Sequence, residues 1–93
     1  MTFIEKIKQL REQSQLPQRK VAEALDIDSA TYCKIERGER KAKREQLLVI
    51  AELLKTDKDE LLMLWLADQV TAVVADEKKI ADQVLNIVKE NIK

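Results

Sequence analysis

Glycine and proline are nearly absent from this chain, and their scarcity limits what it can fold into. The 93 residues include one of each, Gly38 and Pro17. Turn-rich β folds need many such residues at their reversals, whereas helix interiors exclude both. Because 45% of the residues are apolar, the chain has enough apolar material to fold around a core. We therefore expect an all-α fold in one small domain that carries an appendage.

Six helical segments follow from the apolar spacing and from signals at the helix ends. Thr2 with Glu5 three residues later forms a capping box, Asp28 and Asp57 are good N-caps, and Gly38 is a natural helix end. The expected helices cover residues 2–13, 17–25, 29–37 and 44–55, a stretch that opens at residue 57, and residues 77–92. The pattern leaves open whether the chain bends near residues 76–79 or stays helical there.

Basic side chains are concentrated in the first half of the chain, although the formal net charge is zero. Residues 1–46 carry 11 Lys and Arg against 8 Asp and Glu, and residues 47–93 carry 6 against 9. Residues 34–44 alone hold six basic side chains and two acidic ones. A phosphate backbone responds to such a local patch, because salt screens charges that lie beyond about 8–10 Å. The distribution therefore favours a nucleic-acid partner that the net charge alone argues against.

The chain has too few His and Cys side chains for most catalytic and metal sites. The chain has no His and only one Cys, Cys33, so a zinc site, a catalytic triad and an intrachain disulfide lack their usual residues. Acidic pairs such as Asp57 and Asp59 lie in a helix cap, where no concave apolar site is implied. The longest apolar run, residues 61–67, is too short to cross a bilayer, and no signal peptide is recognisable. We expect a cytoplasmic protein that is not an enzyme, with no metal, cofactor or membrane association.

The predicted helix at residues 29–37 has two unlike faces. Tyr32, Ile35 and Glu36 share one face, which is typical of a core. The opposite face is small and polar with two cations, and its members are Ala30, Cys33, Lys34 and Arg37. On this pattern Cys33 is a small filler residue, a contact to a base edge or a redox sensor. The outer face belongs neither to a core nor to an ordinary solvated surface.

Two short helices joined by a turn of three or four residues form the helix-turn-helix unit, and residues 18–37 have the lengths it needs. In this region the chain resembles the Xre/Cro phage-repressor helix-turn-helix family, over residues 3–62. The matching positions are Ile7, Leu10, Arg11, Leu16, Gln18, Ala22, Leu25, Ile27, Ile35, Glu36, Arg37, Gly38, Leu47, Ala51 and Leu54. The resemblance implies a bundle of five short helices that binds specific DNA sequences, mostly in repression.

The resemblance also assigns roles to single residues. Gln18 would hold a phosphate at the start of the second helix, and Arg11 would pair with Glu36 in the interior. Bases would be contacted by Ser29, Ala30, Thr31, Cys33 and Lys34. The DNA backbone would be contacted by Arg37, Arg40, Lys41 and Lys43, and Arg19 joins this DNA-binding set. Three positions depart from the family: Asp26 replaces a usual Gly, Pro17 a Ser or Thr cap, and Ala42 a frequent Pro.

The chain beyond residue 60 has more apolar surface than one small domain covers easily. A helix over residues 61–67 is apolar on every side, so it has to be covered all round. We expect a second copy of the chain to cover it, the alternative being a last helix that folds back on its own domain. The expected dimer interface consists of Leu62, Trp65, Leu66, Val70, Val73, Val74, Ile80, Val84 and Ile87.

These features predict a sequence-specific DNA-binding transcriptional regulator with a helix-turn-helix domain at residues 1–68 and a helical dimerisation segment at residues 69–93. We expect a repressor that binds a palindromic operator on double-stranded DNA as a homodimer. An alternative is an antitoxin or a restriction-modification controller whose C-terminal helices bind a partner protein such as a toxin. A helical adaptor that binds no DNA is a third interpretation.

Overall fold

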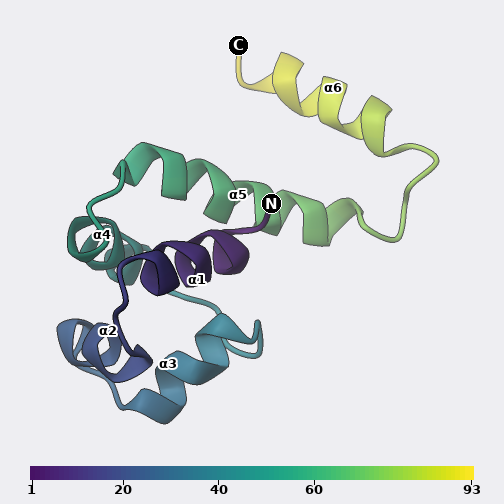
Figure 1. Cartoon of the computed structure of the whole chain (residues 1–93). Coiled ribbons are helices and arrows are strands. Elements are labelled where there is room, and N and C mark those ends of the chain that lie inside the picture. Colours follow the sequence, from purple (N-terminus) through teal and green to yellow (C-terminus); the bar gives the residue numbers. More distant parts are fainter.

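The computed structural model describes residues 1–93 and contains six helices and no strand, which confirms the predicted all-α fold. The helices are α1 (Phe3–Gln13), α2 (Gln18–Leu25), α3 (Ser29–Glu36), α4 (Arg44–Leu53), α5 (Lys58–Val74) and α6 (Ala81–Asn91). Helices α1 to α5 form one bundle, and α6 extends from the C-terminal end of α5, away from α1–α4 (Figure 1). This is the expected five-helix bundle with a helical extension.

The core lies where the first five helices meet, and every helix of the bundle contributes to it. Twelve apolar side chains are buried there: Phe3, Ile7, Val21, Ala22, Tyr32, Ile35, Ala42, Leu47, Ile50, Ala51, Leu54 and Leu61. Apart from Ala42, they come from the helical stretches that the apolar spacing predicts. A core of this kind fixes the short helices α2 and α3, which are too short to be stable alone.

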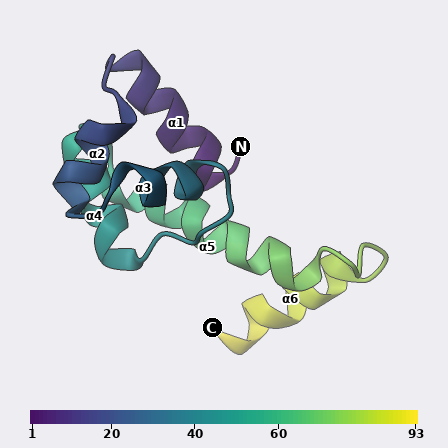
Figure 2. The same ribbon diagram turned by 90° about the horizontal axis from the view of Figure 1, so that it is seen from below.

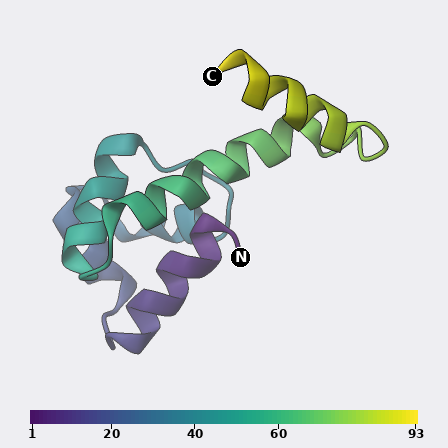
Figure 3. The same ribbon diagram turned by 90° about the horizontal axis from the view of Figure 1, so that it is seen from above.

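Helix α5 is longer than the part of it that packs on the core. It runs unbroken to Val74, so the domain boundary expected at residue 68 falls inside a continuous helix. The chain then turns over residues 75–80 before α6 begins, which settles the bend that the sequence left open (Figure 3). No side chain of α6 is buried, and the molecule measures 42 × 25 × 22 Å. None of the helices has both the length and the apolar character that a membrane span requires.

Four helices end in a left-handed residue, although the chain has a single glycine. The φ angles are 57° at Gln15, 57° at Asp26, 54° at Lys55 and 78° at Gly38. At each of these ends, backbone N–H groups reach back to carbonyls of the last helical turn. A side chain in this conformation costs about 1 kcal/mol, and Asp tolerates it better than most residues. The turns therefore form without glycine at three of the four helix ends, at the cost of backbone strain there.

We expect replacement of Lys55 by glycine to stabilise the fold. The side chain is exposed, so Lys55→Gly relieves the left-handed strain without removing buried contacts and should raise the free energy of unfolding by about 0.5–1 kcal/mol. The matched control is Lys8→Gly at an exposed position inside α1, where glycine should cost about 1 kcal/mol. Urea unfolding measures both, and a similar loss in the two variants would contradict the prediction.

Candidate DNA-binding surface

Helices α2 and α3 are joined by a three-residue turn that both helix ends define. Asp26 takes the left-handed conformation after α2, as its position in the turn requires. Asp28 caps α3, because its Oδ1 accepts a hydrogen bond from the Thr31 N–H at 2.6 Å. Pro17 precedes α2 and provides no side-chain cap. The unit thus has the geometry of a helix, a tight turn and a second helix.

Helix α3 buries one face and presents the other to solvent. Tyr32, Ile35 and Glu36 are buried against the bundle. Of the residues expected to contact DNA, Ser29, Ala30, Lys34 and Arg37 are exposed, and Thr31 and Cys33 are half-buried. Seen from below, α3 lies in front of the bundle, and the chain after it curves past α5 to α4 (Figure 2). The outer face of α3 is therefore accessible along its length.

The basic loop, residues 37–43, continues this accessible face. Gly38 and Glu39 close the end of α3 through N–H bonds to the Ile35 and Lys34 carbonyls, at 3.0 and 2.9 Å. Glycine suits position 38 without strain, because its φ is positive and an added Cβ would meet the Ile4 side chain at 3.2 Å. Inside the loop Ala42 is buried and anchors the segment, a place the sequence did not indicate.

The cations of the basic loop have different surroundings. Arg40 and Lys43 are exposed and take part in no ion pair. Arg37 forms an exposed pair with Glu39, its Nε 2.7 Å from the carboxylate, and such pairs are weak. Lys41 has partners within the chain: its Nζ donates to Gln69 Oε1 at 2.7 Å and lies 5.2 Å from the centre of the Trp65 ring.

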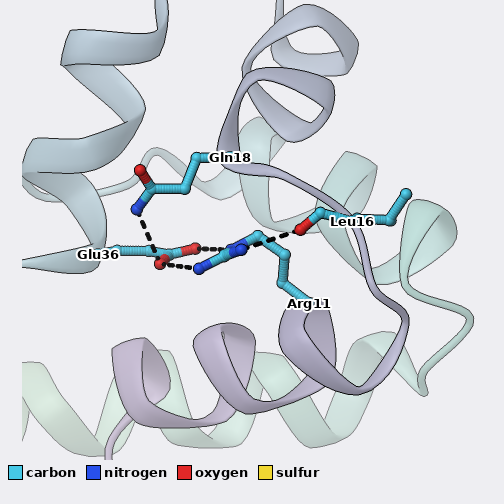
Figure 4. A network of polar contacts seen from close by, with 4 residues as sticks. All are labelled: Arg11, Leu16, Gln18 and Glu36. Carbon is cyan, nitrogen blue, oxygen red and sulfur yellow. Dashed lines mark hydrogen bonds and ion pairs between the residues drawn. The ribbon is translucent and has the colours of Figure 1, made fainter.

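An interior network joins α1, α2 and α3 behind this surface (Figure 4). The Arg11 guanidinium donates to both oxygens of Glu36, at 2.7 and 3.0 Å, and to the Leu16 carbonyl at 2.9 Å. Gln18 Nε2 donates to Glu36 Oε1 at 3.1 Å. The side chains of Arg11 and Glu36 are 12% and 3% exposed. Gln18, expected at a phosphate, therefore stands at the start of α2 with its amide nitrogen used inside the network.

The titration behaviour of the network follows from these contacts. The hydrogen bonds to Glu36 raise the pKa of Arg11 despite its burial. Burial alone would raise the pKa of Glu36, but the guanidinium holds it below its ordinary value. Burial, and then the neighbouring carboxylate, raises the pKa of Tyr32, whose buried hydroxyl has no hydrogen-bond partner. Both members of the pair thus stay charged at neutral pH.

A comparison with protein-family models matches residues 5–64 to a helix-turn-helix domain. The chain belongs to the helix-turn-helix domain family. The match covers most of α1, all of α2 to α4 and the start of α5, and it leaves α6 outside. Comparisons with curated protein sequences and with solved structures give no significant match. In this helix-turn-helix domain α3 is the second helix of the unit, the one that enters the major groove in proteins of this kind.

The residues expected at a dimer interface divide into two groups. Leu62 and Trp65 pack against the core of their own chain, and the Trp65 indole N–H donates to the Ala42 carbonyl at 2.9 Å. Leu66, Val70, Val73, Ile80 and Ile87 are exposed, and Val74 and Val84 are half-buried. Met63, 64% exposed, shares the outward side of α5 with Leu66 and Val70, and its i, i+3, i+7 spacing could have revealed it.

Removal of either member of the interior pair should strongly destabilise the helix-turn-helix domain. Arg11→Ala leaves a buried carboxylate without its partner, and Glu36→Ala leaves a buried guanidinium, so each should lower the free energy of unfolding by about 3–5 kcal/mol. Glu23→Ala is the control, because it removes the exposed pair with Lys20 and should cost less than about 1 kcal/mol. Urea unfolding at neutral pH compares them. Losses below about 1 kcal/mol for both Arg11 and Glu36 variants would refute the structural role.

Proposed function

We propose that this helix-turn-helix protein is a sequence-specific transcriptional regulator of the Xre/Cro type, acting as a repressor in the cytoplasm. The observation that carries the proposal is the exposed outer face of α3, which continues without interruption into the basic loop. A surface that combines small polar side chains with cations suits base edges beside a phosphate backbone. The buried network behind α3 supports this, since a helix that reads bases has to be held in a fixed orientation.

The proposed contacts follow from the position of each side chain. Ser29 and Ala30 lie at the N-terminal end of α3, where base edges are usually met, and Lys34 lies one turn further on. A lysine suits the O6 and N7 acceptors of guanine, and Ser accepts several bases. Half-buried Thr31 and Cys33 would meet bases only at the margin of this face. Arg37, Arg40 and Lys43 would contact phosphates. Arg19 would do so from the start of α2, and so would Gln18 through the amide hydrogen that its bond to Glu36 does not use.

DNA binding should depend on the exposed cations in two distinct ways. Lys34→Ala should weaken binding and relax specificity at one or two base pairs, because its side chain would contact base edges. Arg40→Ala and Lys43→Ala should weaken binding to all sequences about equally, and each should lower the slope of log K against log salt by about one. Selection of bound genomic fragments would supply the operator, and anisotropy titrations over a salt series would supply the slopes. Unchanged affinity in all three variants would show that the surface is misassigned.

We further propose that the protein binds a palindromic operator as a homodimer formed through α5 and α6. The outward stripe of α5, Met63, Leu66, Val70 and Val73, is 42–80% exposed along a helix of about 25 Å. Soluble monomers rarely expose large contiguous apolar patches, so such a stripe indicates a partner. Stable interfaces bury about 800 Å² on each side, more than one helix face supplies. The unburied apolar side chains of α6, with Ile87 61% exposed, would complete the area.

A charge on the outward stripe should separate the protomers without unfolding the domain. Val70→Glu places a carboxylate where the second copy would pack, so sedimentation at about 10 µM should change from dimer to monomer. Thr71→Glu, at an exposed position off the stripe and about 100° round the helix from Val70, is the control and should stay dimeric. The dimer should bind half-sites about 34–36 Å apart, and the Val70→Glu monomer should lose preference for that spacing. A wild-type chain that sediments as a monomer at this concentration would end the dimer proposal.

The exposed apolar face of α6 supports one alternative, an antitoxin or restriction-modification controller that binds a partner protein. Ile87 and Val88 are exposed on a helix that has no buried residue, and Ile92 is exposed directly after it. Removal of residues 81–93 distinguishes the two proposals. The dimer proposal expects weaker self-association, whereas the alternative expects an intact dimer that no longer copurifies with a coexpressed neighbour-encoded protein.

A further inference from the structure

Two residues of α5, about one turn apart, hold the basic loop in place. The Trp65 indole N–H donates to the Ala42 carbonyl at 2.9 Å, which fixes the loop backbone. The side-chain Oε1 of Gln69 accepts from the Lys41 ammonium at 2.7 Å, and the same ammonium lies 5.2 Å from the centre of the Trp65 ring. Gln69 Nε2 in turn donates to the Trp65 carbonyl at 3.4 Å. Two consecutive loop residues, 41 and 42, are thus bound to two residues of α5.

The loop cations differ in their surroundings because of this attachment. Lys41 is drawn onto the aromatic face and the amide of α5, where a cation is attracted by the ring. Arg40 and Lys43, on either side of the attached pair, have no acidic partner and remain exposed. A ligand phosphate would therefore find Arg40 and Lys43 free and the ammonium of Lys41 already engaged.

We infer that Trp65, Gln69 and Lys41 are positioning residues for DNA binding: they hold the basic loop so that Arg40 and Lys43 reach phosphates, and Lys41 is not itself a phosphate contact. This inference rests on the proposed DNA-binding function. It also departs from the sequence-based expectation, which placed Lys41 with the other cations at the backbone. A loop that is ordered before binding loses less conformational entropy in the complex, so its attachment strengthens binding without adding a contact.

Gln69→Ala separates this role from a direct contact, because only the positioning role predicts a fall in DNA affinity. The variant keeps the charge of Lys41 and removes only the acceptor that holds it. If the attachment positions the loop, DNA affinity falls about five-fold, the worth of one hydrogen bond, and the salt slope does not change. If Lys41 is a phosphate contact, release of its ammonium leaves affinity unchanged or raises it.

Trp65→Phe tests the second point of attachment with an aromatic ring retained. It removes the indole N–H that binds the Ala42 carbonyl, and the inference expects a similar loss of affinity with an unchanged salt slope. Lys43→Ala is the contrasting variant, because removal of a phosphate contact lowers the slope by about 0.9. Thr71→Ala, exposed on the other side of α5, is the matched control and should bind like wild type. Urea unfolding of each variant confirms that the folded fraction is the same in the binding assay.

The fluorescence of Trp65, the chain's only tryptophan, reports on the attachment directly. Addition of operator DNA to the full-length protein should leave its emission unchanged if Lys41 stays on the ring, whereas Gln69→Ala should shift the emission of the free protein. Unchanged or stronger DNA binding by Gln69→Ala, or an emission change when wild type binds DNA, would overturn the inference and leave the proposed function intact. Absence of salt-dependent DNA binding by wild type would overturn both.

Discussion

A single buried pair of opposite charges determines how the first three helices meet. Arg11 comes from α1 and Glu36 is the last residue of α3, and their two parallel hydrogen bonds fix both distance and orientation. The Leu16 carbonyl and the Gln18 amide extend the contact to the segment that leads into α2. Buried ion pairs add little net stability compared with apolar side chains. The Arg11–Glu36 pair instead fixes the orientation of α3. Since the residue after Glu36 begins the basic loop, the pair also sets how the outer face of α3 and the loop cations are presented.

Sequence patterns predicted the helices and the inward face of α3 because these depend on local spacing. Ile7 and Ile35 lie on the periodic positions of their helices, and Gly38 marks a helix end that glycine occupies without strain. The left-handed turns at Gln15 and Lys55 carried no such signal, because neither residue type favours that conformation and only the packing of the flanking helices imposes it. The glycine content alone would therefore not have indicated left-handed turns at these two positions.

Apart from the Arg11–Glu36 pair, which the family resemblance implied, contacts between distant segments could not be predicted from the sequence pattern. A run of cations does not show which of them has partners within the chain, and Lys41, itself exposed, differs from Arg40 and Lys43 only through partners 24 and 28 positions away. The apolar segment 61–67 posed a similar problem. When every side of a helix is apolar, periodicity does not reveal which side faces the core, so Trp65 was grouped with Leu66 although the two lie on different sides of α5.

Because α5 is one continuous helix, it fixes the distance and the rotation between its core-bound end and the outward stripe. One end is bound to the core and the basic loop, and the outward stripe extends along the rest of the same rigid rod. Each residue of an α-helix advances about 1.5 Å and turns about 100°. Loss of one residue between Gln69 and Val73 would redirect the last part of the stripe by that angle without altering a side chain of α3, whereas insertion of a whole heptad into the intact helix would leave the direction nearly unchanged. The direction in which a second molecule could approach is therefore set by helical phase, a property that insertions and deletions change in discrete steps and that substitutions leave untouched.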